Sequence, residues 1–225
     1  MSYTSQHLQK HIQPDVLEEV VQHIKTSKSD CILQAEVIDS EMVVVARRAD
    51  IVEMLYFLRD DAQCQFKILV DICGVDWLGR EGREQERFDV VYHLLSVAKN
   101  LRLRVKVHVA EEESVPTATD VFSSANWYER ECYDLLGIPF EGHPDLRRIL
   151  TDYDFDGHPL RKDFPLTGKV EAYYDEKEER VAYKPLDMPQ EFREFDKTSN
   201  WQGVSGNMVL AEEDNVFDED EFKNT

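Results

Sequence analysis

Positive charge is scarce in this sequence. Its 225 residues include 26 Lys and Arg against 46 Asp and Glu, which gives a formal net charge of −20 at pH 7. A surface that binds nucleic acid or anionic lipid needs a patch of cations. The charge balance therefore argues against a nucleic-acid partner.

Long apolar stretches are also missing. No run approaches the ~18 consecutive apolar residues that a membrane-spanning helix requires. The N-terminal sequence MSYTSQHLQKHIQ contains neither the apolar core of a secretory signal nor the arginines of a transit peptide. We therefore expect a chain with no direct membrane span.

The sequence has no closely spaced pair of cysteines. Its four cysteines lie at positions 31, 64, 73 and 132, whereas iron–sulfur clusters and structural zinc sites rely on thiolates a few residues apart. Glycine-rich nucleotide loops and the G-x-S-x-G nucleophile motif are missing as well. We therefore expect no catalytic residue, metal site or cofactor site in this chain, and interpret the cysteines as small buried apolar residues.

The first 137 residues alternate between helical and strand patterns. Apolar residues recur with helical spacing from Pro14 and again from Asp50, which stands at an N-cap position. A third helix is predicted over 127–136, with Asn126 as its N-cap and Gly137 just past its end. Strands are predicted at 31–38, 41–47, 66–77, 87–97 and 101–109. Short turns between strands, with helices on one face of a mixed or antiparallel sheet, predict a two-layer α+β body.

Beyond residue 137 the regular patterns fade. Six of the eight prolines and six of the nine glycines lie at or after this position, yet aromatic residues are frequent between Phe140 and Trp201. A stretch this long with few regular elements is unusual inside a compact domain, and its aromatic content is too high for ordinary disorder. We therefore predict a body at 1–137, an extended arm at 138–200 that packs on another protein, and a solvated acidic tail at 201–225.

The arm contains DYDFDGHPLRKDF at 152–164, whose acidic residues match the first half of a calcium-binding EF-hand loop. Pro159 would stand where that loop needs a backbone N–H, and Arg161 and Lys162 would place two cations beside the ion. Asp163 is shorter than the Glu that usually completes such a site. These details argue against calcium.

Two other chemical interpretations also fail. His143 and His158 stand in turn sequences without a third ligand nearby, which argues against a metal centre. Glu129 and Glu131 cannot form an acid–base pair, because residues two apart on a helix point in nearly opposite directions.

The charged residues of the third predicted helix have a structural interpretation. Glu129, at the third helical position, would cap the N-terminus, and Arg130 can reach Asp134 one turn further on. A contact with a partner protein is the alternative for these residues.

The polar face of the predicted strand at 101–109 is cationic. It carries Arg102, Arg104, Lys106 and His108. Such a stripe is either a solvated face balanced by neighbouring acids or a docking surface, and the sequence leaves both open.

The sequence ERECYDLLGIPFEGHPDLRRIL, at 129–150, resembles the signature of the 30-kilodalton subunit family of respiratory complex I, also called the C subunit of NADH-quinone oxidoreductase. The signature combines Glu-Arg-Glu with an acid, apolar residues, a His or Lys and a basic residue at fixed spacing. It is filled by Glu129, Arg130, Glu131, Asp134, Leu135, Leu136, His143, Arg147, Ile149 and Leu150. The blocks DFDGHPLRKDFPLTGKVE and QEFREFD are also similar to this family.

The resemblance implies a hydrophilic subunit in the peripheral arm of a proton-pumping NADH:quinone oxidoreductase. Such a subunit holds no redox centre, and FMN, iron–sulfur clusters and quinone belong to other subunits. Its expected neighbour is the 49-kilodalton subunit, which helps to form the quinone site and along which the C-terminal arm would lie. The complex would place the chain on the inner membrane, on the cytoplasmic side in a bacterium or the matrix side in a mitochondrion.

The resemblance also marks the residues expected to contact partners. They are Glu129, Arg130, Glu131, Asp134, His143, Arg147, Arg148, Asp156, His158, Arg161, Lys162, Asp163 and Phe164. The alternative function is the equivalent subunit of a related membrane-bound hydrogenase, which the co-purifying redox partners would distinguish. A stand-alone enzyme or metal-binding protein would require turnover or bound metal in the isolated chain, and no motif predicts either.

Overall fold

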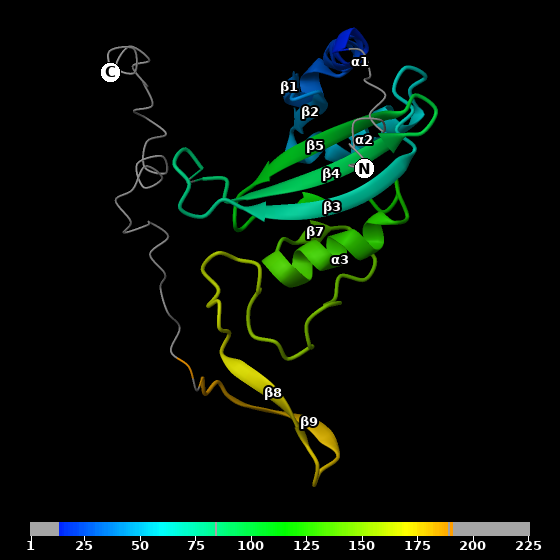
Figure 1. Cartoon of the computed structure of the whole chain (residues 1–225). Coiled ribbons are helices and arrows are strands. Elements are labelled where there is room, and N and C mark those ends of the chain that lie inside the picture. The colour runs from blue at the N-terminus through cyan, green and yellow to red at the C-terminus, as the bar shows by residue number, and fades with distance from the viewer. Residues whose placement is uncertain (1–13, 84, 189, 191–225) are drawn as a thin grey trace, which may run out of the picture. The chain divides into compact units, whose positions relative to one another are not determined.

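The computed structural model describes residues 14–83, 85–188 and 190. Among these residues, a five-stranded sheet and three α-helices form an α+β unit, as the sequence predicts (Figure 1). None of the helices in this described part combines the length and the apolar character needed to cross a membrane. The chain divides into a unit that ends at Lys169 and a second unit that begins at Val170.

The main sheet has the strand order β1-β2-β5-β4-β3. Its strands are β1 (Ile32–Ile38), β2 (Glu41–Ala46), β3 (Ile68–Asp76), β4 (Phe88–Ser96) and β5 (Leu101–Val109). The sheet is mixed, because β2 and β5 run parallel while the other neighbours run antiparallel. Asp39 and Ser40 join β1 to β2 with positive φ angles of 49° and 66°, as a primed hairpin turn requires.

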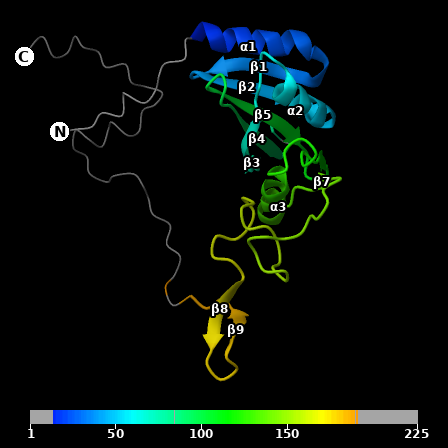
Figure 2. The ribbon, with the colours of Figure 1, turned by 90° about the vertical axis from the view of Figure 1, so that its right-hand side faces the viewer.

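The helices share one core with one face of this sheet. They are α1 (Pro14–Ser27), α2 (Ile51–Asp60) and α3 (Ala125–Leu136), with short 3-10 turns η2 (Ser29–Cys31) and η3 (Arg48–Asp50). Alternate strand residues such as Val44 and Val105 are fully buried, and the same core contains Ile24, Leu55 and Cys132 from the three helices. Figure 2 shows α1 beside β1 and β2, while α3 packs against β3 at the other edge of the sheet.

The start of α3 differs from the sequence prediction. The helix begins at Ala125, so Asn126 lies inside its first turn and the predicted N-cap is wrong. Ser124 already has helical φ and ψ (−65° and −23°), which extends the turn upstream of Asn126. The end of the helix is as predicted, because Gly137 takes a left-handed φ of 75°. Asp50 precedes α2 as predicted, but its side chain makes no capping hydrogen bond to the described residues.

Two small ladders complete the described structure. β6 (Val115–Pro116) and β7 (Phe140–Glu141) pair in parallel and hold the chain after α3 against the segment before it. The second unit contains the hairpin of β8 (Val170–Asp175) and β9 (Arg180–Pro185). The sequence divides the chain at residue 137, whereas the segment up to Lys169 belongs to the same unit as the body. The arm boundaries remain a prediction, and the tail at 201–225 lies outside the described residues.

Candidate functional site

The signature residues gather where α3 meets the segment that follows it. We call residues 143–164 the strap. Its first residue, His143, bonds to Asn126 in the first turn of α3, and its residue His158 bonds to Asp134 near the other end. The strap therefore spans the length of the helix (Figure 1).

Glu129 is a buried carboxyl group rather than a helix cap. Its Oε1 accepts the backbone N–H of Ala118 and its Oε2 accepts the hydroxyl of Thr117, each at 2.6 Å. Burial raises the pKa of Glu129 to about 7, although both hydrogen bonds oppose the shift. The predicted capping role is wrong, because the side chain points into the fold and fastens the segment before α3.

His143 completes the surroundings of this carboxyl group. Its Nδ1 accepts the N–H of Asp145 at 3.0 Å, so Nε2 carries the proton and donates to the carbonyl of Asn126 at 3.1 Å. The same Nε2 lies 3.9 Å from Oε2 of Glu129, and both side chains are fully buried. His143 therefore ties the start of the strap to the start of α3.

Asp134 holds the middle of the strap. Its Oδ2 accepts the consecutive backbone N–H groups of Ile149, Leu150 and Thr151 at 2.7–3.0 Å. Its Oδ1 bonds to the Thr151 hydroxyl and to Nη1 of Arg148, the latter at 2.8 Å. Burial opposes ionisation, but these hydrogen bonds outweigh it and hold the pKa of Asp134 well below its usual range. Asp134 therefore remains an anion at the pH of a cell.

Arg130 binds the strap and not Asp134. The side chain is buried, and its Nε and Nη2 donate to the carbonyls of Arg147 and Arg148 at 3.1 Å. The guanidinium also lies over the ring of Trp127, 5.1 Å from its centroid. The predicted pair of Arg130 with Asp134, one turn away, is wrong. The strap provides two carbonyl acceptors for Arg130, and it provides Arg148 as the cation that binds Asp134.

The strap also caps the C-terminal end of α3. Three donors of the strap bind the last carbonyls of the helix. Nδ1 of His158 donates to the carbonyl of Asp134, and the backbone N–H of Leu160 donates to the carbonyl of Leu135. Nε of Arg161 donates to the carbonyl of Leu136. The last carbonyls of a helix have no partner inside the helix and need donors from elsewhere. Cations at this end also oppose the negative pole of the helix dipole. The conformation of the strap is thus determined by α3.

A buried cluster of charges fastens the end of the strap to the sheet. Arg87, at the start of β4, faces Asp76 at the end of β3, with its Nη2 2.9 Å from Oδ2 of Asp76. The same guanidinium contacts Glu111 at 3.0 Å and Asp163 of the strap at 2.8 Å. Asp76 also accepts the N–H of Lys162 at 2.9 Å. The bond to Asp76 is the main reason why the pKa of Arg87 lies above its usual value.

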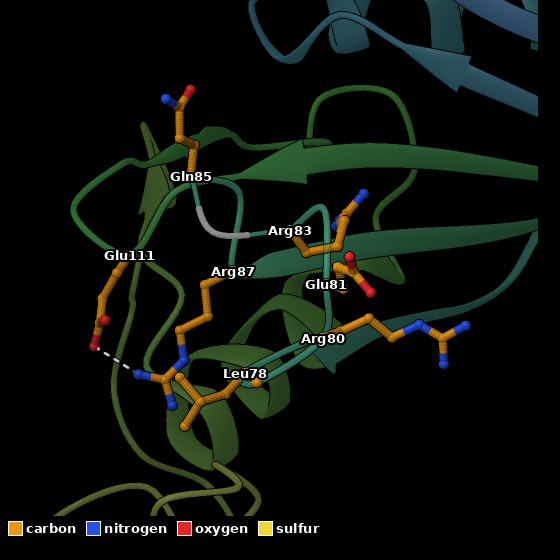
Figure 3. Close-up of a pocket in the computed structure, with 8 residues that line it drawn as sticks. Leu78, Arg80, Glu81, Arg83, Gln85, Arg87 and Glu111 are labelled. Carbon is orange, nitrogen blue, oxygen red and sulfur yellow. Dashed lines mark hydrogen bonds and ion pairs between the residues drawn. The ribbon is translucent and has the colours of Figure 1, made fainter.

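A hollow of about 500 Å³ opens beside this cluster (Figure 3). Its lining includes Arg80, Arg83 and Arg87 together with Glu81 and Glu111, and the dashed line in Figure 3 marks the bond between Arg87 and Glu111. The buried cation Arg87 already faces three carboxylates, so this residue offers little uncompensated positive charge to a free anion in the hollow.

Some of the other residues that the resemblance marks as partner contacts pack against neighbouring side chains, and others lie on the surface. Phe155 and Phe164 stack with centroids 5.7 Å apart. The residues Glu131, Arg147, Asp156 and Lys162 are exposed. Large apolar side chains of the same region are exposed as well: Leu150, Tyr153, Leu160 and Leu166. The strap therefore has one side bound to the body and another side open.

Several residues of this site escaped the sequence analysis. Asp76 and Arg87 flank the loop between β3 and β4, and Thr117 and Thr151 lie in other loops. All four lie outside the signature at 129–150. The available signal was the placement of Asp76 and Arg87 at adjoining ends of two apolar strands, where opposite charges can pair across strands.

The cationic stripe is partly neutralised by neighbouring acids. Arg104 pairs with Glu41, and His108 lies 2.6 Å from Asp89. These contacts agree with a balanced face, and they leave a docking role for Arg102 and Lys106 open.

The described residues contain one group of three side chains that could hold a metal ion. His23, Asp61 and Cys64 have ligand atoms within 4.8 Å of one another. Asp61 accepts the N–H groups of Gln63 and Cys64 at 2.8 and 3.2 Å, which explains its position as a turn cap. Burial raises the pKa of Cys64 to about 12, which disfavours the thiolate that a metal needs.

Comparison with known proteins decides the family. Residues 43–170 match the family described as "Respiratory-chain NADH dehydrogenase, 30 Kd subunit". The chain belongs to this family. The C subunit of the NADH-quinone oxidoreductase of Agrobacterium fabrum is 51% identical over 190 residues, which cover 84% of this chain and 93% of the relative. The protein of the same description from Paramagnetospirillum magneticum is 58% identical over 163 residues, 72% of this chain and 80% of the relative.

Two solved structures are similar to this fold. A trypsin-resistant fragment (1–134) of Nqo5 is 37% identical, covers 58% of this chain and 99% of the fragment, and gives a TM-score of 0.50. A chain of the membrane-bound sulfane sulfur reductase, an archaeal respiratory membrane complex, is 26% identical, covers 66% of this chain and 85% of that one, and gives a TM-score of 0.56.

Membership in the family confirms the resemblance that the sequence at 129–150 indicates. The chain is a subunit of NADH-quinone oxidoreductase, complex I of the respiratory chain, and belongs to its peripheral arm. The family match ends at residue 170, so it includes the strap and stops where β8 begins.

Proposed function

We propose that this chain is a structural subunit without a redox centre, which supports electron transfer from NADH to quinone by docking on the 49-kilodalton subunit. One observation carries the proposal. The strap is held by α3 and the sheet on one side, while Leu160 within it and Leu166 just after it are 60% and 84% exposed. Clustered exposed apolar side chains mark contact surfaces in proteins.

The cysteines support the part of the proposal that assigns no iron–sulfur cluster to this chain. Such clusters are held by four thiolates in the usual case. The one group of potential metal ligands in the described residues contains a single thiol. Burial also raises the pKa of Cys31, Cys73 and Cys132. The proposal therefore assigns iron–sulfur clusters to other subunits of the complex, together with the FMN and quinone that the family resemblance places there.

The solved fragment supports a partner-dependent C-terminal region. The resistant piece of Nqo5 ends at residue 134 and covers 58% of this chain, which is close to the share taken by the α+β body. Proteases cleave segments that open easily. We infer that the segment after α3 gains further stability from a neighbouring subunit, in addition to the contacts that α3 makes with the strap. The complex would hold the chain on the inner membrane, at the cytoplasmic side in a bacterium or the matrix side in a mitochondrion.

A related membrane complex is the second candidate. The similarity to the archaeal sulfane sulfur reductase complex shows that this fold occurs outside NADH dehydrogenases. The two relatives described above from NADH-quinone oxidoreductases are 51% and 58% identical, against 26% for that chain, which favours NADH-quinone oxidoreductase.

The docking proposal is tested on detergent-solubilised membranes separated on a native gel and stained for NADH dehydrogenase activity. The variant Leu160→Asp/Leu166→Asp should lower the share of the chain in the large active band. Val97→Asp is the matched control, because Val97 is 66% exposed and lies in the turn between β4 and β5. Equal assembly of the two variants would contradict docking through the strap. Crosslinks from the strap to a neighbour other than the 49-kilodalton subunit would contradict the named partner.

A further inference from the structure

The β8–β9 hairpin has two chemically different faces. Its register places Ala172 opposite Tyr183 and Tyr174 opposite Val181, with Val170 opposite Pro185. Successive residues of a strand point to opposite sides, and residues directly opposite each other share a side. One side, the apolar face, therefore consists of Val170, Ala172, Tyr174, Val181, Tyr183 and Pro185. The other side, the charged face, consists of Glu171, Tyr173, Asp175, Arg180, Ala182 and Lys184.

The charged face is satisfied within the hairpin. Nζ of Lys184 lies 2.5 Å from Oε1 of Glu171, its cross-strand partner, and 5.8 Å from the centroid of the Tyr173 ring. These contacts neutralise the charges of Glu171 and Lys184, as expected for a side that remains in water.

The apolar face has large side chains in water. Tyr174 and Val181 are 60% and 57% exposed, and Val170 and Tyr183 are more than half exposed. A two-stranded hairpin is marginally stable in water by itself and needs a third strand or a packed surface. Aromatic side chains with a polar tip are enriched at protein interfaces. The pattern therefore indicates a face that another surface covers.

We propose that the apolar face of the hairpin docks on an uncharged apolar surface of a neighbouring protein in the oxidoreductase. This inference rests on the proposed function, because it needs a neighbour that the C-terminal region of the chain already binds. The surface should also offer a hydrogen-bond acceptor, such as a backbone carbonyl, to the hydroxyl group of Tyr174. Tyr174 is the expected anchor, since tyrosine is among the residues that dominate interface energies.

Charge argues for a protein partner over a lipid surface. Residues 170–185 carry five acidic and three basic side chains. The headgroups of anionic lipids repel such a segment, and membrane-binding segments are rich in Lys and Arg.

Size argues against a second copy of this chain. The apolar face has six side chains, whereas a stable interface takes roughly 20–30 residues from each partner. A contact this small holds as one part of a larger interface made by the same chain. A neighbouring protein that other parts of the chain also contact meets this requirement, because the linked contacts raise the effective concentration of each.

The test uses adjacent cross-strand pairs on the two faces. Tyr174→Glu/Val181→Glu alters the apolar face, and Tyr173→Glu/Ala182→Glu alters the charged face one position away. Both variants place two glutamates directly opposite each other, so both introduce the same cross-strand repulsion into the free hairpin. The pair Tyr174→Ser and Tyr173→Ser repeats the comparison without added charge.

The full-length chain is added to solubilised membranes from a strain that lacks it, and recovery of the large active band is titrated. We expect Tyr174→Glu/Val181→Glu to raise the concentration for half-maximal recovery about tenfold, because it removes an interface anchor. The control variant should stay within about twofold of wild type. Equal recovery by both variants, while Leu160→Asp/Leu166→Asp still fails, would overturn the hairpin contact and leave the proposed function intact. Failure of the wild-type chain to join the band would instead reject the proposed function.

Two further results would overturn the choice of partner. One is a dimer of the isolated chain in sedimentation that only the apolar-face variant abolishes. The other is binding to vesicles of anionic phospholipid that only this variant loses. Strong protection of the hairpin amides from hydrogen exchange in the assembled enzyme, compared with the isolated chain, would support a covered face.

Discussion

Nη1 of Arg148 lies 2.8 Å from Oδ1 of Asp134, and this pair is the centre of the joint between α3 and the strap. Arg148 also donates through Nη2 to the carbonyls of Phe155 and Gly157, at 2.9 and 3.1 Å. One buried carboxylate and one guanidinium thus satisfy backbone groups over nine residues of a segment that has no helix or strand. Hydrogen bonds to charged groups are stronger than those between neutral groups, which explains how an irregular segment takes a defined path.

Asp134→Asn should destabilise the full chain by about 2–4 kcal/mol, because it leaves Arg148 without its anion and places an NH₂ group among backbone donors. Urea unfolding measures the loss, and hydrogen exchange should be fastest at residues 149–151. Asp145→Asn is the control, since the pair of Asp145 with Arg147 is more than half exposed and should contribute little to stability. An equal loss in both variants would contradict a special role for Asp134.

Glu129 should give the stability a specific pH dependence. Its pKa is raised from 4.5 to about 7 in the folded chain, so the folded state favours the protonated carboxyl. The stability from this group is complete below about pH 4.5, falls as the pH rises to about 7, and then levels off.

The variant Glu129→Gln isolates this effect. It keeps an acceptor for the N–H of Ala118 and cannot ionise. As the pH rises from about 4.5 to 7, its urea midpoint should therefore increase relative to that of the wild type. Glu131→Gln, at an exposed position two residues on, should follow the wild-type curve. A wild-type curve parallel to that of Glu129→Gln would show that the carboxyl group is not buried as described.

Gly137→Ala should damage the contact between α3 and the strap. The φ of 75° is strained for alanine, and its Cβ would lie 2.6 Å from the His158 ring and 2.7 Å from Nη2 of Arg161. Gly168→Ala has the same φ of 75° but meets open space, so it measures the backbone cost alone, about 1 kcal/mol. We expect Gly137→Ala to lower the free energy of unfolding by at least about 1 kcal/mol more than this control. Equal losses would mean that the strap accommodates the methyl group.

Arg87→Met should be among the most destabilising changes of a charged residue. It leaves the carboxylate of Asp76, which is 2% exposed in its side chain, without a cation, at a cost of about 3–5 kcal/mol. Asp163→Asn removes a half-exposed contact of the same guanidinium and should cost about 1 kcal/mol or less. Chemical denaturation of the two variants and the double variant gives the comparison. A small effect of Arg87→Met would show that Asp76 is stabilised by backbone donors alone.

Most of the α+β body could be predicted from local patterns. The strict alternation of LRLRVKVHV appears as β5, with Leu101, Leu103 and Val105 buried. The left-handed Gly137 ends α3 as its position after the apolar helix face predicts. These features follow from the spacing of the apolar residues and from the backbone freedom of glycine. Both depend only on residues that are close together in the sequence.

The errors occurred where long-range contacts override local rules. Glu129 stands where a capping carboxylate is expected, but Thr117 and Ala118 bind it inside the fold. Arg130 and Asp134 stand one turn apart, yet the strap binds each of them separately. A pair on a helix surface gains only ~0.2–0.5 kcal/mol, which is less than a buried, charge-assisted hydrogen bond contributes.

The fold class and the order of most elements follow from the residue pattern alone, and the spacing of the charged signature indicates the family. These are properties of local periodicity and of residue order. Only the tertiary structure decided that Asp134, Arg130 and His158 hold the strap on α3, and that β8 and β9 separate six apolar side chains from a charged face. Such relations depend on which backbone groups remain unsatisfied after the helix and sheet have formed, and on cross-strand register, which the chain specifies only once it is folded.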